Sequence, residues 1–161
     1  MLNKKALVAE ILARLKNDLA NNMAAAEQAH KASTDEESIA ETQYDTLAIE
    51  AAYLAEGRSR RVLEIQSAIK AYQKLKLIKF DLDTQIAPGA LVQLSQDKNR
   101  NHWYFIGPAA GGQKLSQDNT QVTVITPQSP LGQSLIGKYQ DDDLQLQIAD
   151  RKLTDYISSV F

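Results

Sequence analysis

The stretch Lys31–Asp45, KASTDEESIAETQYD, decides how this chain is organised. It holds five carboxylates against one lysine, and it separates two long segments of helical periodicity. Ser33 with Glu36, and Thr34 with Glu37, have the spacing of a capping box, which predicts that a helix begins at residue 33 or 34. Two helices joined by so short a turn run antiparallel, so the stretch is the predicted acidic tip of a helical hairpin. The simpler interpretation is a helix start whose carboxylates only offset the helix dipole.

The two segments that flank the tip have matching apolar seams. The first predicted helix, from about Asn3 to Lys31, lacks proline and glycine, and the second runs from about Asp35 to Lys74. A coiled-coil seam repeats at alternating steps of four and three residues. On the first helix it comprises Val8, Leu12, Leu15, Leu19, Asn22, Ala26, Ala29 and Ser33. On the second it comprises Glu41, Tyr44, Ala48, Ala51, Ala55, Arg58, Val62, Ile65, Ile69 and Tyr72. Both seams shrink toward the tip, which predicts a slender far end, and Gly57 permits a close backbone approach or a bend.

After the second helix the apolar spacing changes to alternation. Ile78, Phe80 and Leu82 predict a first strand, and Pro88-Gly89 marks a turn. Further strands are predicted at 90–94, 103–106, 122–125, 144–148 and 153–160, with a short helix at 130–136 closed by Gly137. The predicted fold class is α+β: a coiled-coil hairpin over residues 1–76, with its tip near 33–41, followed by a small antiparallel β domain over residues 77–161.

Composition excludes several classes of protein. The chain has no cysteine, so it holds no disulfide, thiolate zinc site or cysteine nucleophile. Neither a signal peptide nor a membrane span is evident, so we expect a cytoplasmic protein without membrane contact. Motifs of nucleotide binding and of hydrolysis are missing, and His30 and His102 have no neighbouring metal ligand. We therefore predict that the protein is not an enzyme and has no cofactor of its own, and that His102 is a strand residue.

Charge is sorted along the hairpin. The acidic tip contrasts with a basic stem over residues 58–79. This stem carries Arg58, Arg60, Arg61 and four lysines, and its one acidic residue is Glu64. A solvated helix surface explains this pattern most simply, and a rod that enters a passage lined with polyanions explains it functionally. The tip carboxylates are candidate Mg²⁺ ligands, and a partner must complete their site because Mg²⁺ retains several waters at one or two carboxylates. These candidates are Asp35, Glu36, Glu37 and Glu41.

A resemblance becomes specific in the stretch VITPQSPLGQSLIGKYQDDD, residues 124–143. Ser129-Pro130, then Leu135-Ile136-Gly137-Lys138, then an acidic cluster resemble the C-terminal domain of the bacterial GreA/GreB transcript-cleavage factors. The order of hairpin and β domain and the run Glu56-Gly57-Arg58 extend the similarity over nearly the whole chain. The resemblance implies an FKBP-like β domain that binds RNA polymerase through Gln128, Ser129 and Pro130. It also implies a hairpin in the secondary channel, which places the stem arginines near channel walls and nascent RNA, and a monomeric protein.

In that family two acidic tip residues help hold the second Mg²⁺ of the polymerase, which then cleaves backtracked RNA. The tip of this chain departs from the pattern. The family glutamate falls on Glu41, but its aspartate falls on Ser38 and its asparagine on Thr42, and Tyr44 is displaced by one position. Glu37 lies beside the missing aspartate. Cleavage assisted by Glu37 and Glu41 is thus one expected outcome, and channel binding that inhibits or modulates elongation without cleavage is the other. The absence of cysteine argues against the zinc-bearing DksA branch of channel binders.

Two other classes remain as alternatives. An FKBP-like domain suggests a peptidyl-prolyl isomerase, whose pocket would be lined by aromatic rings, and here the candidates are Trp103, Tyr104 and Phe105. A long coiled coil suggests an adaptor, but an adaptor seam would stay apolar toward the tip. Co-purification with core RNA polymerase separates the first hypothesis from both.

Overall fold

The computed structural model describes residues 2–34 and 46–161 and divides the chain into two compact units. One unit is Ile11–Lys70 and contains most of the hairpin. The other combines the chain up to Glu10 with Ala71–Phe161, so it holds the β domain together with the first turns of one helix and the last residues of the other.

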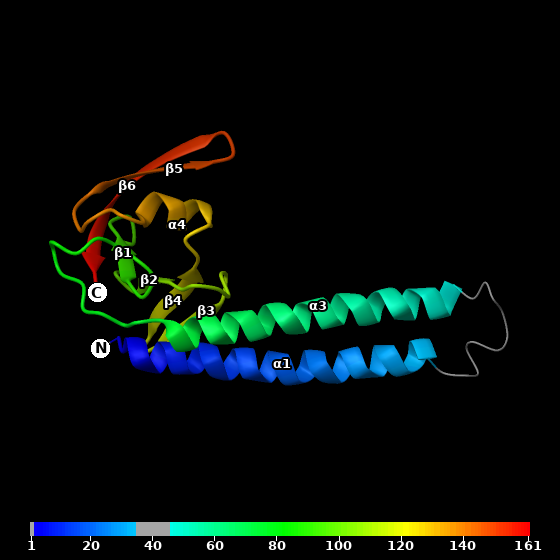
Figure 1. Cartoon of the computed structure of the whole chain (residues 1–161). Coiled ribbons are helices and arrows are strands. Elements are labelled where there is room, and N and C mark those ends of the chain that lie inside the picture. Colours follow the sequence, from blue (N-terminus) through cyan, green and yellow to red (C-terminus); the bar gives the residue numbers. More distant parts are fainter. Residues whose placement is uncertain (1, 35–45) are drawn as a thin grey trace. The chain divides into compact units, whose positions relative to one another are not determined.

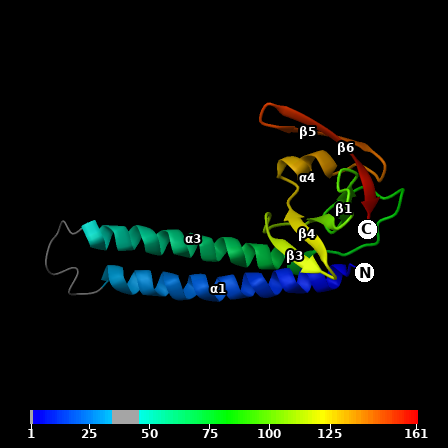
Figure 2. The ribbon, with the colours of Figure 1, turned by 180° about the vertical axis from the view of Figure 1, so that it is seen from behind.

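Two long helices run side by side in opposite directions, α1 over Lys4–Thr34 and α3 over Thr46–Lys74 (Figures 1 and 2). This confirms the helical hairpin and the predicted end of the second helix at Lys74. The predicted helix start at Ser33 or Thr34 is wrong, because both residues belong to α1. Helix-favouring residues such as Ala32 allow α1 to continue past the expected stop at Lys31, and neither proline nor glycine interrupts it.

From Ala51 to Tyr72, burial along α3 mostly follows the predicted seam, whose members Glu41 and Tyr44 lie outside the described residues. Ile65, Ile69 and Tyr72 are buried, and Ala51, Ala55 and Val62 are partly buried, whereas Arg58 is exposed although the seam included it. On α1 the seam is wrong by one residue near the base. There Leu7 and Ile11 are fully buried, while Val8 and Leu12 are only partly buried. The buried residues Leu7, Ile11 and Leu15 are separated by steps of four and four, so a strict 4-3 spacing selected their apolar neighbours Val8 and Leu12 instead.

Asn3 starts α1 and connects it to the sheet. Its side-chain oxygen accepts a hydrogen bond from the Ala6 N–H at 3.1 Å, which is the role of an N-cap residue. The backbone N–H of Asn3 donates to the side-chain oxygen of Gln117 at 2.6 Å. A second contact fixes the same turn: the Lys4 ammonium lies 4.8 Å from the ring centre of Phe80 and 5.1 Å from that of Phe161. Within this unit the helix start is therefore held by residues of the β domain that are distant in sequence: Gln117 of β3, Phe80 and Phe161.

Six strands form one sheet in the order β3-β4-β2-β1-β6-β5. The strands are β1 Leu91–Leu94, β2 His102–Ile106, β3 Lys114–Gln117, β4 Thr120–Ile125, β5 Asp143–Ile148 and β6 Arg151–Val160. Five of them match predicted segments, and β3 lies inside a stretch that we expected to be a loop. The expected strand at 78–82 is wrong: Phe80 is buried, but Ile78 and Leu82 are 48% and 61% exposed, and no strand forms there.

The sheet is mostly but not wholly antiparallel. β2 and β4 pair in parallel, with Tyr104 opposite Thr123 and Phe105 opposite Val124, and β3 pairs antiparallel to β4 at the edge. The all-antiparallel prediction is therefore corrected at this one pair, because the chain after β2 forms the edge strand β3 before it returns as β4.

One face of the sheet carries the short helix α4, Pro130–Leu135. Leu135 joins a buried cluster on this face, and Leu131 packs against that cluster. The cluster comprises Phe80, Ile86, Ala90, Val92, Leu94, Ile106, Ile125, Leu135, Leu144 and Ile157. The short helix predicted over 130–136 is thus confirmed, and Gly137 follows it with a positive φ of 79°. In the described ranges, 2–34 and 46–161, none of the helices has the length and apolar character of a membrane span.

Candidate functional site

The segment that carries the predicted docking residues is built around Ser129. Its hydroxyl accepts a hydrogen bond from the Gly132 N–H at 3.1 Å and donates one to the Thr126 carbonyl at 2.7 Å. Ser129 is therefore the N-cap of α4, and Pro130 occupies the first helical position, where its missing N–H costs nothing. The Ser-Pro pair has a structural role, since it starts the helix.

The three predicted docking residues differ in how exposed they are to solvent. Gln128 and Pro130 are exposed, and Ser129 is half-buried with its hydroxyl engaged in the cap. Gln128 and Pro130 are thus available to a partner protein, while Ser129 contributes by holding the turn between them.

A pocket of about 610 Å³ lies beside this turn. Its walls come from three parts of the β domain: α4 with the residues before it, the ends of strands β1, β2 and β4, and the β5–β6 hairpin. Figures 1 and 2 show that hairpin extending past the sheet beside α4, which packs against β5. The apolar lining residues are Leu94, Ile125, Pro130, Leu131, Leu146 and Leu153. The volume lies within the range of about 300–1,000 Å³ that is typical of ligand sites.

The polar lining of the pocket is acidic and contains no lysine or arginine. Oδ1 of Asp155 accepts hydrogen bonds from the N–H groups of Ser95 at 3.1 Å, Gln96 at 3.3 Å and Tyr156 at 2.8 Å, and from the Ser95 hydroxyl. Oδ2 of Asp97 accepts one from the His102 N–H at 2.8 Å. These bonds fix both carboxylates through one oxygen each.

Two rings complete the polar side of the pocket. His102 and Tyr104 lie with their ring centres 4.6 Å apart and tilted by 43°, and Nε2 of His102 is 2.9 Å from the Thr123 hydroxyl. Burial raises the pKa of the Tyr104 phenol, and the negative charges of Asp97 and Asp155 raise it further. The electrostatic potential at the phenol is therefore negative, as expected beside two carboxylates. His102 is a strand residue of β2, as predicted.

The aromatic lining that an isomerase pocket would need is sparse. Of the three candidate rings, only Tyr104 lines this pocket. Phe105 is fully buried, and Trp103 lines a different pocket with Leu2 and Val160. The pocket therefore lacks the set of aromatic rings that the isomerase interpretation requires.

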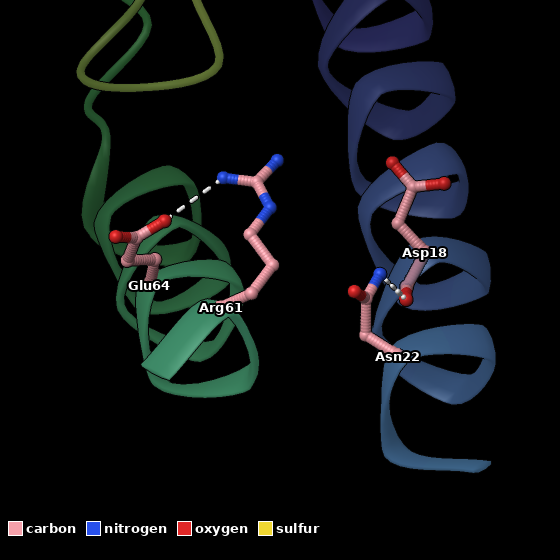
Figure 3. A network of polar contacts seen from close by, with 4 residues as sticks. All are labelled: Asp18, Asn22, Arg61 and Glu64. Atoms are coloured by element: carbon pink, nitrogen blue, oxygen red, sulfur yellow. Dashed lines mark hydrogen bonds and ion pairs between the residues drawn. The ribbon is translucent and has the colours of Figure 1, made fainter. Parts of the chain in front are cut away.

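The basic stem is partly neutralised within its own helix. Arg60 pairs with Glu56 at 3.1 Å and Arg61 with Glu64 at 3.0 Å, and all four side chains are more than half exposed. Figure 3 shows the Arg61–Glu64 pair on α3, and on α1 the amide of Asn22 that donates to the Asp18 carbonyl at 2.8 Å. Arg58 is exposed and has no polar partner in the described part of the chain. Of the three predicted stem arginines, Arg58 is thus the most available to a polyanion.

The predicted metal ligands Asp35, Glu36, Glu37 and Glu41 lie outside the described residues. Among residues 2–34 and 46–161 no group of three or more His, Asp or Glu side chains has the geometry to hold a metal ion.

Sequence reasoning missed the acidic pocket and one glycine. Asp97, His102, Tyr104 and Asp155 are spread over 59 positions and meet only through strand pairing, so no local motif signals them. Gly132 had a local signal, since it stands three residues after an N-cap serine. A Cβ at this position would lie 1.9 Å from the Thr126 carbonyl oxygen, so only glycine fits the first turn of α4.

Comparisons with known proteins were made at the levels of family, sequence and structure. The chain matches no family model and none of the curated proteins searched. Among solved structures it is similar to the transcription factor Gfh1, with 18% identity over 92% of both chains and a TM-score of 0.39. It is also similar to GreA factor homolog 1 of Thermus thermophilus, with 15% identity over 93% of this chain and 94% of that one and a TM-score of 0.35. A third similar structure is Gfh1 of Thermus aquaticus, with 16% identity over 92% of both chains and a TM-score of 0.36.

Proposed function

We propose that this protein binds bacterial RNA polymerase through its β domain and inserts its helical hairpin into the secondary channel, where it modulates transcription elongation. The observation that carries the proposal is the turn at residues 128–130. The sequence motif that resembles the GreA/GreB docking segment forms a capped turn there, with Gln128 and Pro130 exposed beside a pocket that has apolar walls and two carboxylates.

The hairpin supports the same proposal. A coiled coil with helices of 31 and 29 residues spans more than 40 Å, by the helix rise of about 1.5 Å per residue. A protein that only needed a docking domain would gain nothing from such a rod. Rods of this kind carry a group to a place that a globular domain cannot enter, and the sequence places a dense set of carboxylates at the far end.

For the tip we propose that Glu37 and Glu41 act near the catalytic metals of the polymerase, with Asp35 and Glu36 adding negative charge. Paired metal ions stabilise the attacking and leaving oxygens of phosphoryl transfer, and a carboxylate that helps hold the second ion would promote cleavage of backtracked RNA. Because Ser38 replaces the family aspartate, channel occupation that modulates elongation without cleavage is the competing form of this proposal.

Binding is tested by co-purification of the protein with core RNA polymerase, comparing wild type with the double variant Gln128→Ala, Pro130→Ala. Loss of two exposed contact side chains should weaken binding at least about tenfold, because interface side chains that dominate affinity contribute about 2 kcal/mol or more each. The protein should stay folded, with no more than about 1 kcal/mol of stability lost from Pro130 at the helix start. Gln85→Ala with Pro88→Ala is the matched control, since it changes the same residue types at exposed positions elsewhere in the β domain. Equal binding by the two double variants would refute the docking assignment.

Cleavage is tested separately with stalled elongation complexes. Purified protein should either shorten the 3′ end of backtracked RNA or slow elongation without shortening it. The first result assigns the tip a catalytic role, and the second assigns the protein to channel occupation alone.

A further inference from the structure

Part of the apolar lining of the pocket beside α4 is left exposed, because no other described residue of the β domain packs over it. Leu144 and Ile157 near the base of the β5–β6 hairpin are fully buried, but farther along the same hairpin Leu146 is only partly buried and Leu153 is 43% exposed. Leu146 and Leu153 are cross-strand partners, so they form one apolar surface opposite Leu131 of α4. A side chain from outside can complete this packing.

The polar end of the pocket favours a positively charged ligand. Oδ1 of Asp97 and Oδ2 of Asp155 accept no hydrogen bond from any residue in the ranges that the structure describes. Both carboxylates are held in place through their other oxygen. Each therefore presents one oriented acceptor, and a ligand can bind it without the entropy cost of ordering the aspartate side chain. A neutral donor could satisfy one acceptor, but two negative charges in one pocket favour a cation with several donors.

A guanidinium meets these requirements better than an ammonium. It is planar and presents five N–H donors in a rigid fork, so it can bond two carboxylates at once. It also stacks on aromatic rings, and the Tyr104 and His102 rings lie at the same end of the pocket. The three methylenes of an arginine side chain match the apolar walls that lead to that end.

We propose that the pocket formed by α4, the β5–β6 hairpin and the rings of β2 binds an arginine side chain of a partner protein segment in which an apolar residue adjoins the arginine. The arginine stem packs on Leu131, Leu146 and Leu153, and the guanidinium bonds Asp97 and Asp155. If the proposed function is correct, the segment belongs to RNA polymerase, and this identification of the partner is the only part that rests on that function.

The pocket is tested first without any polymerase. A capped Leu-Arg-Leu peptide is titrated into ¹⁵N-labelled protein and compared with peptides that carry citrulline or lysine in place of arginine. Citrulline keeps the shape of the arginine side chain and removes its charge. We expect the arginine peptide to shift the amide signals of Leu94, His102, Tyr104 and Leu131, and to bind about tenfold more tightly than the citrulline peptide, as expected for a hydrogen bond to a charged group. Equal binding of citrulline refutes the charge assignment, equal binding of lysine refutes the guanidinium assignment, and no shifts at these amides refutes the pocket.

Two variants test the same contacts from the side of the protein. Asp97→Asn keeps an oxygen that can accept from the His102 N–H but removes a charge, and it should weaken the arginine peptide about tenfold. Asp83→Asn is its control, because Asp83 is exposed in a loop away from the pocket. Leu153→Lys places a cation at the pocket rim and should block the peptide, whereas Leu82→Lys, at another exposed leucine, should not. Unchanged affinity in both pocket variants overturns the proposal.

The polymerase measurement is then made independently. A protein that binds the arginine peptide but not core polymerase leaves the pocket assignment intact and refutes the proposed function. A protein that binds core polymerase but distinguishes none of the peptides refutes the arginine pocket alone.

Discussion

A single methyl group at position 132 would collide with the backbone. The Cβ of an alanine there would lie 1.9 Å from the Thr126 carbonyl oxygen and 3.0 Å from Oγ of Ser129. Both atoms belong to the capped turn that starts α4, so the turn must open to admit the side chain. We predict that Gly132→Ala destabilises the protein by about 3 kcal/mol, the upper part of the usual range for overpacking. Urea unfolding followed by tryptophan fluorescence measures this, and a loss below about 1 kcal/mol would show that the turn relaxes easily.

Tyr72 makes a buried polar contact within the unit that contains the β domain. It is 2% exposed, and its hydroxyl donates to the Ala109 carbonyl at 2.8 Å. Phenylalanine at this position leaves that carbonyl without a donor, so Tyr72→Phe should destabilise the protein by about 1–2 kcal/mol. Tyr53→Phe is the control, because Tyr53 is 71% exposed and should change the free energy of unfolding by no more than a few tenths of a kcal/mol. Equal effects of the two variants would contradict the role of this hydrogen bond.

Tyr72 also makes the free energy of unfolding depend on pH in the alkaline range. Burial raises the pKa of the Tyr72 phenol far above its ordinary value of 10.0. The folded state therefore keeps the phenolic proton where the unfolded state loses it. The stabilisation is fully present below pH 10 and is lost as pH rises from that value toward the folded pKa. Tyr72→Phe should consequently show a shallower loss of stability above pH 10 than wild type does.

At the scale of one element, α3 contains a glycine that its packing does not require. A Cβ built on Gly57 meets no atom within 4 Å, so the expectation of a close backbone approach is wrong. Because glycine costs about 1 kcal/mol relative to alanine inside a helix, Gly57→Ala should stabilise the protein by up to that amount. The measurement is thermal unfolding, and a lower melting temperature would mean that helical glycine here serves a bend. The contrast with Gly132→Ala provides an internal control, since the same chemical change should have the opposite sign.

The helical elements were largely predictable because their pattern is local. The seam of α3 at Ala51, Ala55, Val62, Ile65 and Ile69 follows directly from spacing. On α1 the seam was displaced by one position near the base, because the buried residues Leu7, Ile11 and Leu15 follow steps of four and four whereas the 4-3 pattern selected their apolar neighbours Val8 and Leu12. The short helix α4 was likewise predicted between Pro130 and Gly137, while the capping role of Ser129 emerged only from the structure.

The β elements were less predictable because strand partners are distant in sequence. β3, Lys114–Gln117, alternates with only Leu115 buried, which is too weak a pattern to distinguish from a loop. The apolar spacing of Ile78, Phe80 and Leu82 suggested a strand, but no neighbouring strand pairs with it. For the same reason the acidic pocket could not be foreseen, since Asp97 and Asp155 meet only once β1 and β6 have paired.

At the scale of the whole molecule, binding and activity should be separable by mutation. We predict that Glu36→Ala, Glu37→Ala and Glu41→Ala together leave polymerase binding within about twofold and remove the effect on transcript cleavage. The reason is that, in the proposed function, residues 128–130 bind the polymerase, whereas the tip carboxylates follow a helix of 31 residues, more than about 40 Å long by helix rise, and act near the metals. A control triple variant changes Glu50, Asp83 and Asp150, all exposed, and removes the same number of charges. Inhibition of elongation that survives the tip variant would instead support channel occupation without metal chemistry.

The discontinuity of the unit that contains the β domain has a consequence for biosynthesis. Leu91 and Phe161 exchange both of their backbone hydrogen bonds, at 2.9 and 2.8 Å, and the residues up to Glu10 belong to the same unit. The helical hairpin lies between these parts in the sequence, and its own contacts are closed by a short connection. During translation the hairpin can therefore form early, whereas the first residues of the chain must wait for their sheet partners. Because β6 follows every other strand in the sequence, the sheet cannot close before β6 has been synthesised, so the β domain matures after the helical hairpin.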